Sequence, residues 1–260
     1  MVNRTLELNK IYCMDCVEGM KQIEDNSIHL CFTSPPYNCN IQYDTYNDNR
    51  ELEEYFSFIK EVFAEVYRIL VVGGRCAVNI PNAIKIGDDV VFLGVYYQRI
   101  FDDIGFITRE HITWVKGYNE NNFQGNNTAW GSWKSPSNPH LRSLTEKIIV
   151  LSKKNMKLEG VESDLTANEF KEWTKNCWFV PTDNSPEHPA TFPFELAKRI
   201  IKLYSWKGNT IIEPFSGRGT TCIMAKTLNR DFIGFEISQR YVDIANKRLT
   251  QETLQSKEWF

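Results

Sequence analysis

The sequence has 260 residues, of which 42% are hydrophobic and 24% charged, and its formal net charge is −3. These values are ordinary for a globular protein with a full hydrophobic core. No apolar run approaches the roughly 20 residues of a membrane span, and the N-terminal residues lack the apolar stretch of a secretory signal. The scattered cysteines favour a reduced, cytoplasmic protein. Cys13 and Cys16 form a single CxxC with no second pair, so we predict no metal site.

The small net charge hides two segments of opposite charge. Residues 43–65 contain seven acidic and two basic side chains, whereas residues 134–157 contain six basic side chains and one acidic one, Glu146. Two solvated faces would explain this pattern. A polyanionic partner would instead bind the second segment and avoid the first.

The predicted elements alternate between strand and helix along the chain. A helix is expected from Leu52, where apolar residues recur on one face, and Gly73-Gly74 ends it. We expect further helices over residues 88–104, 193–204, 218–229 and 238–249. We expect strands over residues 11–15, 28–35, 75–81, 106–116, 146–153, 209–214 and 231–236. The alternation predicts an α/β fold, in which a mainly parallel sheet carries helices on both faces. The polar stretch 118–143 is predicted to be a long surface loop.

The strand at 28–35 runs into Ser34-Pro35-Pro36-Tyr37. Two adjacent prolines give up two backbone donors and exclude helix for the residues before them. A simple turn would use Gly, Asn or Asp instead. The stretch therefore predicts a rigid, extended backbone with an aromatic ring at its exit, although Tyr37 could also be core packing.

A glycine-rich turn, IIEPFSGRGTT, lies between a predicted strand and a predicted helix. Gly217 and Gly219 would let a ligand approach the backbone closely. The turn lacks the third glycine of a dinucleotide fingerprint and the Lys of a Walker A loop. Glu213 precedes the turn, and Glu236 ends the next strand, where doubly wound folds place a carboxylate on a ribose hydroxyl. The alternative is an ordinary turn with Glu236 as a helix cap.

Four polar residues follow or end predicted strands: Asp15, Ser34, Glu213 and Glu236. Ligands of doubly wound sheets bind beyond the carboxyl ends of the strands. We therefore expect these four side chains to converge on one edge of the sheet.

Four motifs together resemble the DNA methyltransferases that modify exocyclic amino groups. SPPY resembles their (Asp/Asn/Ser)-Pro-Pro-(Tyr/Phe/Trp) signature, and EPFSGRGTT resembles their S-adenosylmethionine loop, with Glu213 where Asp is usual. YCMDCVEGM and HPATFPFELAKRII look like two further motifs of the family. SPPY precedes the glycine loop, which is the order of the family's β group. The resemblance implies a circularly permuted, Rossmann-like methyltransferase fold in one domain, residues 1–260.

The resemblance also implies site residues. The catalytic motif would be Ser34, Pro35, Pro36 and Tyr37. The cofactor would be S-adenosylmethionine, bound by Asp15, Cys16, Thr33, His188, Glu213, Phe215, Gly217, Gly219, Thr220 and Glu236. Residues 118–175 would form a target-recognition insertion that contacts DNA through Trp130, Trp133, Lys134, Arg142 and Lys147. The partner would be double-stranded DNA, and the resemblance is compatible with a homodimer and with a cognate restriction endonuclease.

The resemblance gives the rigid proline backbone a chemical purpose. The lone pair of an exocyclic amine is conjugated with its ring and is a poor nucleophile. Hydrogen bonds from that amine to the Ser34 hydroxyl and the Pro35 carbonyl would favour a tetrahedral nitrogen, and a preorganised carbonyl makes such bonds effective. Tyr37 would stack on a base flipped out of the duplex. Members with Ser in this motif tend to methylate N4 of cytosine, so we favour this target over N6 of adenine.

Three other functions compete with this hypothesis. A nicotinamide-dependent dehydrogenase would share the fold but is disfavoured by the incomplete glycine pattern. A non-catalytic nucleic-acid-binding module would not need SPPY together with the glycine loop. A methyltransferase acting on protein or RNA is closer, and only the motif order argues for DNA.

Overall fold

The structure, a computed structural model, describes residues 6–86, 89–119, 122–123, 131–141, 143–183 and 192–255. The strands are β1 (Lys10–Cys13), β2 (Ile28–Thr33), β3 (Leu70–Pro81), β4 (Ile84–Ile86), β5 (Asp89–Val91), β6 (Phe106–Asn119), β7 (Asn122–Phe123), β8 (Thr145–Lys153), β9 (Cys177–Val180), β10 (Thr210–Glu213) and β11 (Asp231–Glu236). The helices are α1 (Cys16–Met20), α2 (Leu52–Ile69), α3 (Leu93–Ile104), α4 (Ala167–Trp173), α5 (Phe194–Tyr204), α6 (Thr220–Thr227) and α7 (Gln239–Gln255).

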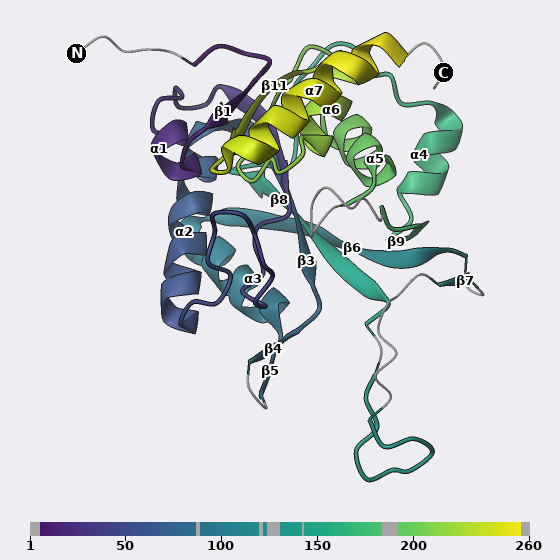
Figure 1. Ribbon diagram of the computed structural model, residues 1–260. Coiled ribbons are helices and arrows are strands. Elements are labelled where there is room, and N and C mark those ends of the chain that lie inside the picture. The colour runs from purple at the N-terminus through teal and green to yellow at the C-terminus, as the bar shows by residue number, and fades with distance from the viewer. Residues whose placement is uncertain are drawn as a thin grey trace.

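One large sheet forms the centre of the molecule (Figure 1), with the strand order β1-β11-β10-β2-β3-β8-β6-β7 and with β9 paired to β6. The strands from β1 to β3 in this order are all parallel to their neighbours, and β8 runs antiparallel to both β3 and β6. The predicted α/β fold with a mainly parallel sheet is confirmed.

Helices cover both faces of the sheet, and each face has its own apolar core. Helices α1, α2 and α3 bury one set of side chains against the sheet, and α5, α6 and α7 bury another set on the opposite face. In α2 the buried residues recur every three or four positions, as an amphipathic helix requires. Strand β3 is buried continuously from Gly73 to Ile80, which is typical of a strand covered on both faces.

The chain differs from prediction at Gly73-Gly74. The helix ends at Ile69 and β3 starts at Leu70, so both glycines lie inside the strand. Gly73 has φ of +77°, and a Cβ on it would collide with the carbonyl oxygen of Lys157. The glycines therefore permit a close backbone approach within the sheet rather than a helix stop.

Further differences concern the start of α3 and several short elements. Helix α3 starts at Leu93 instead of residue 88, because the preceding Ile- and Val-rich residues pair as the β4–β5 hairpin. Helices α1 and α4 and strand β9 were not predicted. Helix α4 begins with a capping box in which Thr166 and Glu169 bond reciprocally.

Several described parts of residues 118–175 belong to the body of the molecule. Strand β8 belongs to the central sheet between β3 and β6, and α4 packs against α5. Residues 131–141 reach away from the body of the molecule (Figure 1). They are closed by a bridge between Gly131 and Pro139.

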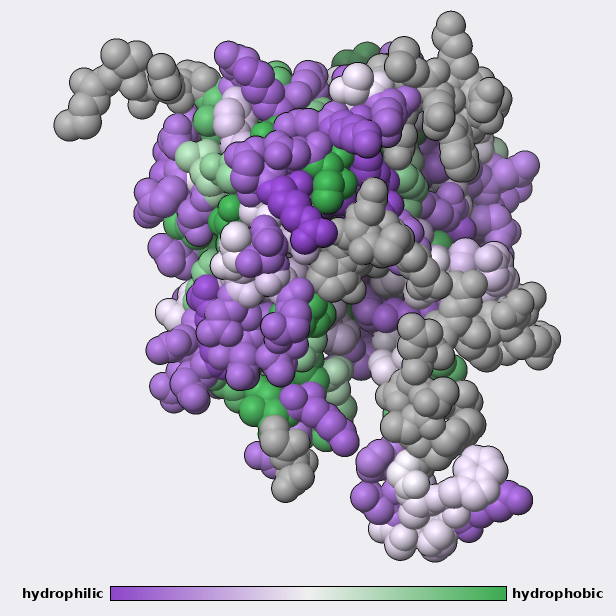
Figure 2. All heavy atoms as spheres, viewed as in Figure 1, coloured by the Kyte–Doolittle hydropathy of each residue, from purple (hydrophilic) through white to green (hydrophobic). Residues whose placement is uncertain are grey.

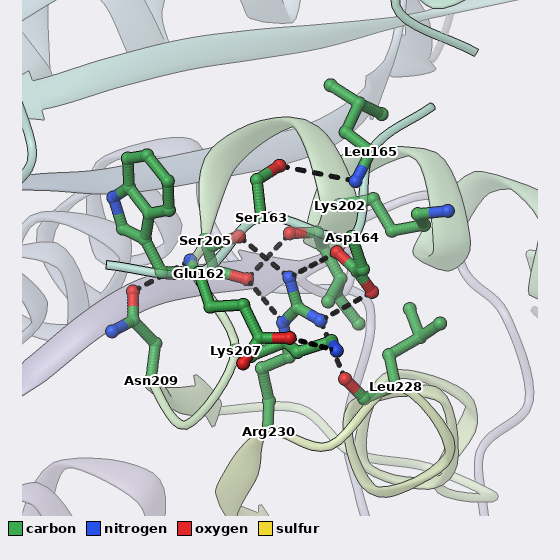
Figure 3. Close-up of polar contacts among 12 residues, drawn as sticks. Glu162, Ser163, Asp164, Leu165, Lys202, Ser205, Lys207, Asn209, Leu228 and Arg230 are labelled. Atoms are coloured by element: carbon green, nitrogen blue, oxygen red, sulfur yellow. Dashed lines mark hydrogen bonds and ion pairs between the residues drawn. The ribbon is translucent and has the colours of Figure 1, made fainter. Parts of the chain in front are cut away.

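A buried arginine fixes the segment before α4 to the core (Figure 3). The Arg230 side chain is fully buried, and its guanidinium donates to both carboxylate oxygens of Asp164 at 2.7 and 2.9 Å. It also donates to the hydroxyl and carbonyl oxygens of Ser205 and to the carbonyl of Leu228. Burial alone would raise the pKa of Asp164, but the hydrogen bonds and charge of Arg230 outweigh it, and the pKa is lowered.

The exposed face in Figure 2 is mainly hydrophilic. An apolar patch lies at the β4–β5 hairpin and the start of α3, where Val90, Phe92 and Val95 are exposed. Within the described part of the chain, no helix combines the length and the apolar character needed to cross a membrane.

Candidate active site

A cavity lies beyond the carboxyl ends of β1, β11, β10 and β2. These four strands are parallel neighbours, so their carboxyl ends meet at one edge of the sheet. The cavity encloses about 1100 Å³ of space, including its open mouth. The residues around it are Met14, Asp15, Cys16, Ser34, Pro35, Pro36, Tyr37, Tyr43, Thr45, Tyr46, Arg50, Phe58, Phe192, Pro214, Phe215, Ser216, Gly217, Arg218, Thr220, Phe235, Glu236, Ile237 and Tyr241.

The two main motifs predicted from the sequence thus meet in one place. Ser34-Pro35-Pro36-Tyr37 lines one part of the cavity, and the glycine turn from Pro214 to Arg218 lines another. Asp15 and Glu236 line the cavity at the ends of β1 and β11, on the side of the glycine turn that faces away from SPPY in the strand order. Of the four polar residues expected to converge, only Glu213 does not line the cavity.

Glu213 supports the glycine turn from inside. It is 2% exposed, and its carboxyl accepts hydrogen bonds from the Thr33 hydroxyl, from the Thr221 hydroxyl at 2.7 Å and from the backbone N–H of Phe215 at 3.1 Å. Burial raises the pKa of Glu213 to about 8 against the lowering effect of these bonds. Thr33 and Glu213 therefore shape the turn, and neither reaches the cavity.

The turn itself requires glycine. Gly217 and Gly219 have φ of +48° and +83°, a region that other residues rarely adopt. A Cβ on Gly219 would also lie 3.0 Å from the Cβ of Ala245 on α7. Gly219 packs the turn against α7 and is not a cavity residue, whereas Gly217 is.

Glu236 joins the end of β11 to the glycine turn. Its Oε2 accepts the backbone N–H of Gly217 at 2.9 Å, and its Oε1 accepts that of Ser238 at 2.8 Å. Burial raises the pKa of this carboxyl. Because each carboxylate oxygen has further lone pairs, Glu236 can still accept a bond from a ligand in the cavity.

Asp15 and Cys16 form the start of α1. The Asp15 side chain caps this helix, with Oδ1 accepting from the N–H groups of Val17 at 2.9 Å and Glu18 at 3.1 Å. Cys16 is buried, and burial raises the pKa of its thiol. Both residues line the cavity, as does Thr220 at the first position of α6.

The SPPY backbone is held from two sides. The Tyr55 hydroxyl of α2 donates to the Pro36 carbonyl at 3.0 Å and contacts the Tyr97 hydroxyl at 2.7 Å. The Ser34 hydroxyl lies 2.5 Å from the Tyr37 hydroxyl. The Pro35 carbonyl has no hydrogen bond with any described residue, which leaves it available as an acceptor.

The segment after SPPY closes over the cavity, which the sequence interpretation missed. Asp48 is 3% exposed and accepts the backbone N–H groups of Asn38 at 2.8 Å, Cys39 at 3.1 Å and Ile41 at 3.0 Å. This bonding folds residues 38–50 back, so that Tyr43, Thr45, Tyr46 and Arg50 line the cavity. The available signal was the pair of aromatic residues inside an acidic segment that was interpreted only as a solvated face.

A second contact fastens this segment to the residues that follow β11. The Ser238 hydroxyl donates to Asp44 Oδ2 at 2.5 Å. The Arg50 guanidinium lies over the rings of Tyr46 and Phe58, at 4.8 and 4.9 Å from their centroids. The cavity wall here is therefore aromatic with one cation.

The residues predicted to contact DNA lie outside the cavity. Trp133 is 64% exposed, with the Lys134 ammonium 5.6 Å from its ring centroid, and Lys147 is exposed on β8. Trp130 and Arg142, together with His188 of the predicted cofactor site, lie outside the described residues.

Comparison with known proteins agrees with this geometry. The family model described as DNA methylase matches residues 28–247. The type II methyltransferase M.BglII of Bacillus subtilis is 30% identical over 94% of this chain and 70% of its own length. M.MjaI of Methanocaldococcus jannaschii is 30% identical over 88% of both chains. The solved structure of TTHA0409 from Thermus thermophilus, a putative DNA modification methylase complexed with S-adenosyl-L-methionine, superposes with a TM-score of 0.74 at 25% identity, covering 94% of this chain and 93% of that one.

Proposed function

This chain belongs to the DNA methylase family, and on that premise we propose that it moves a methyl group from S-adenosylmethionine to the N4 amine of a cytosine in duplex DNA. The observation that carries the proposal is the meeting of SPPY and the glycine turn around one cavity. A binding module would need neither a rigid acceptor backbone nor a glycine turn facing it across the same cavity.

The residues of the cavity suit S-adenosylmethionine. Two carboxyl groups, those of Asp15 and Glu236, lie at its edge, and carboxylates match the hydroxyl groups and positive charge of such a ligand. Phe215 and Tyr46 provide apolar ring surface for the adenine and the methionine chain. When bound, the cofactor supplies an electrophilic methyl group on its sulfonium. We assign Asp15 to the adenine side and Glu236 to the ribose hydroxyls.

In this proposal Thr33, Glu213 and Gly219 do not contact the cofactor directly. They were predicted to bind the cofactor, and the geometry supports a different task, which is to shape the turn that contacts it. Cys16, Thr220 and Gly217 line the cavity and keep their proposed contact roles.

Ser34 and Pro35 would receive the target amine. The Ser34 hydroxyl oxygen and the Pro35 carbonyl oxygen can each accept one N–H of the amine, which directs its lone pair away from the ring. These acceptors are preorganised because Pro36 is bonded to Tyr55 and Ser34 to Tyr37. The Tyr37 ring would stack on the flipped base. Holding amine and methyl group in line then lowers the barrier through proximity and orientation.

N4 of cytosine is favoured by the serine at the first position of the motif. A carboxylate there would be a stronger acceptor and could balance positive charge that develops on the nitrogen. A hydroxyl relies more on the neighbouring carbonyl. The adenine N6 amine has a similar shape, and it is the alternative target.

Residues 118–175 would carry most of the DNA sequence recognition. Trp133 and Lys134 are exposed, and they belong to residues 131–141, which reach away from the body of the molecule (Figure 1). Exposed lysines suit a phosphate backbone. Replacing Lys134, Arg142 and Lys147 together by Ala should reduce the salt slope of DNA binding by up to about three units, since each lost phosphate contact removes about one. Replacing Lys21, Lys60 and Lys207 by Ala makes the same change in charge elsewhere and should leave the slope unchanged. An unaltered slope in the first variant would contradict the assignment.

Mass spectrometry of nucleosides tests the proposed function. Duplex DNA is incubated with the protein and S-adenosylmethionine carrying a labelled methyl group, and is then digested. We expect labelled N4-methylcytosine, and we expect none from the Ser34→Ala variant. N6-methyladenine as the sole product would show that the target base is adenine and not cytosine. No labelled nucleoside, although calorimetry shows the cofactor bound, would contradict the function. A homodimer and a partner endonuclease remain untested predictions.

A further inference from the structure

A buried carboxylate lies behind the SPPY motif, and no motif predicted it. Glu146 is the second residue of β8, is 8% exposed, and pairs with Lys116 of β6 at 2.5 Å. Its Oε2 accepts a hydrogen bond from the Asn79 side chain of β3 at 2.6 Å. Strand β8 lies between β3 and β6, so the carboxylate joins three neighbouring strands at one level of the sheet.

Asn79 connects the Glu146 carboxylate to Tyr37 of the SPPY motif. Its Nδ2 donates to Glu146 at 2.6 Å and also lies 3.0 Å from the Tyr37 hydroxyl. Its Oδ1 has no hydrogen-bond partner among the described residues, although Asn79 is only 1% exposed. A rotated amide would turn Oδ1 toward the Glu146 carboxylate, which would repel it. Glu146 therefore determines which end of the amide faces Tyr37.

Counting donors then determines the direction of the two hydroxyls. Asn79 Nδ2 occupies a lone pair of the Tyr37 oxygen. The nearest acceptor for the Tyr37 proton is Ser34 Oγ at 2.5 Å. The Glu146 carboxylate and the backbone carbonyl oxygen of Asn79 both lie farther away, at 3.4 Å. The Ser34 hydroxyl can then donate its own proton to the backbone carbonyl oxygen of Asn79, which lies at 3.4 Å. Asn79 Nδ2 also lies 3.5 Å from Ser34 Oγ, but its two protons have shorter bonds, to Tyr37 at 3.0 Å and to Glu146 at 2.6 Å. One lone pair of Ser34 is therefore left for a group in the cavity.

We propose that Glu146 is a positioning residue, which acts through Asn79 and Tyr37 to present a free lone pair of Ser34 to the target amine. The inference rests on the proposed function, because it assigns a task within that reaction. Without the carboxylate, the Asn79 amide is free to rotate and the Tyr37 and Ser34 hydroxyls lose their fixed direction. Binding of cofactor and DNA does not depend on this direction, but the methyl-transfer rate does.

A double-mutant cycle tests the proposal. Single-turnover methylation of saturating DNA is measured for the wild type, Glu146→Gln, Tyr37→Phe and the double variant. Tyr37→Phe keeps the ring and removes only the hydroxyl. We expect Glu146→Gln to lower the rate about 10-fold to 100-fold, the effect of losing a hydrogen bond to a charged group. Affinities for cofactor and DNA should stay within a factor of about two of the wild type, which is less than one ordinary hydrogen bond. In the Tyr37→Phe background, Glu146→Gln should have no further effect.

Two outcomes would overturn the proposal: a wild-type rate for Glu146→Gln, or rate losses that multiply in the double variant. If Glu146→Gln does not fold, Asn79→Ala replaces it, because this change cuts the link and leaves the Glu146–Lys116 pair intact. It must show the same rate loss and the same dependence on Tyr37.

A matched control separates this effect from the loss of any buried ion pair. Glu169 of α4 pairs with Lys202 of α5 at 2.6 Å, with side chains 20% and 8% exposed, and neither residue lines the cavity. Glu169→Gln keeps the capping box and should leave the rate unchanged. If the wild type itself forms no methylated nucleoside, the proposed function fails. If the wild type is active and Glu146→Gln is equally active, only the positioning role fails.

Discussion

Two buried polar clusters in this molecule look alike in composition and differ in how completely they are bonded. Around Arg230, every N–H of the guanidinium has an acceptor, and both carboxylate oxygens of Asp164 are used (Figure 3). Around Glu146, Asn79 Oδ1 has no partner among the described residues, and Ser34 and Tyr37, whose hydroxyls belong to this network, line the cavity. Both clusters contain a cation, a carboxylate and a serine hydroxyl.

The difference separates a structural cluster from one that faces chemistry. A fully satisfied network in a region of low dielectric holds its elements in one arrangement and has nothing left to offer a ligand. The Glu146 network reaches the cavity through Ser34, whose hydroxyl oxygen has two lone pairs, so it keeps hydrogen-bonding capacity that a substrate can use. We therefore expect stability to depend mainly on the Arg230 cluster, and the methyl-transfer rate mainly on the Glu146 cluster.

The largest effect on stability should come from Asp164→Asn. This change leaves the Arg230 guanidinium buried without its counter-charge, and breaking such a pair costs about 3 to 5 kcal/mol. For a chain of this size the melting temperature should then fall by roughly 10 °C. Thermal unfolding followed by circular dichroism measures the shift.

Figure 3 also supplies the control for this variant. Glu162 pairs with Lys207 at 2.5 Å near the same cluster, but its side chain is 63% exposed. An exposed pair contributes less than about 1 kcal/mol, so Glu162→Gln should shift the melting temperature very little. Equal shifts in the two variants would show that burial of Arg230 does not make the difference.

An effect of similar size should depend on pH and involve Glu213, whose carboxyl is buried and hydrogen-bonded to the glycine turn. Its pKa is raised to about 8 in the folded chain, above the ordinary 4.5. Below the ordinary pKa both states hold the proton. As pH rises further, the unfolded chain ionises first, so the stability contribution is lost up to about pH 8.

Over this window the free energy of unfolding should fall by about 1.4 kcal/mol per pH unit for one carboxyl. Denaturant unfolding at a series of pH values tests the slope. Glu213→Gln copies the protonated acid, because an amide can donate to a threonine hydroxyl and accept from the Phe215 N–H, and it should reduce the slope. A slope that is the same in this variant would assign it to other groups, such as Glu236, whose pKa is also raised by burial.

The sequence predicted those parts of the site whose chemistry is local. SPPY and EPFSGRGTT each place several functional atoms within a few consecutive residues, and both lie where expected, at the ends of parallel strands. Gly217 shows why, since its φ of +48° is required by the turn that its own neighbours form. Backbone geometry of this kind is encoded at the residue itself.

The sequence did not predict the residues that act through distant strand pairing. Glu146 appeared only as the single acid within a basic segment. Its role depends on β8 entering the sheet between β3 and β6, which brings Asn79 and Lys116 to it. Asp164 and Arg230 are likewise 66 positions apart, and nothing near either residue indicates the other. Glu146 starts the predicted strand 146–153 and Asp164 lies in the predicted insertion 118–175, and neither prediction indicated a buried carboxylate.

The most direct test compares single-turnover methylation by Asp164→Asn and Glu146→Gln. It asks whether the Arg230 cluster determines stability while the Glu146 cluster determines the methyl-transfer rate. Both proteins are assayed at a temperature where circular dichroism shows each to be folded, with cofactor and DNA saturating. We predict that folded Asp164→Asn transfers the methyl group at the wild-type rate, although it is the less stable of the two. Glu146→Gln should be slower by about 10-fold or more. Equal rates in the two folded variants would contradict the account.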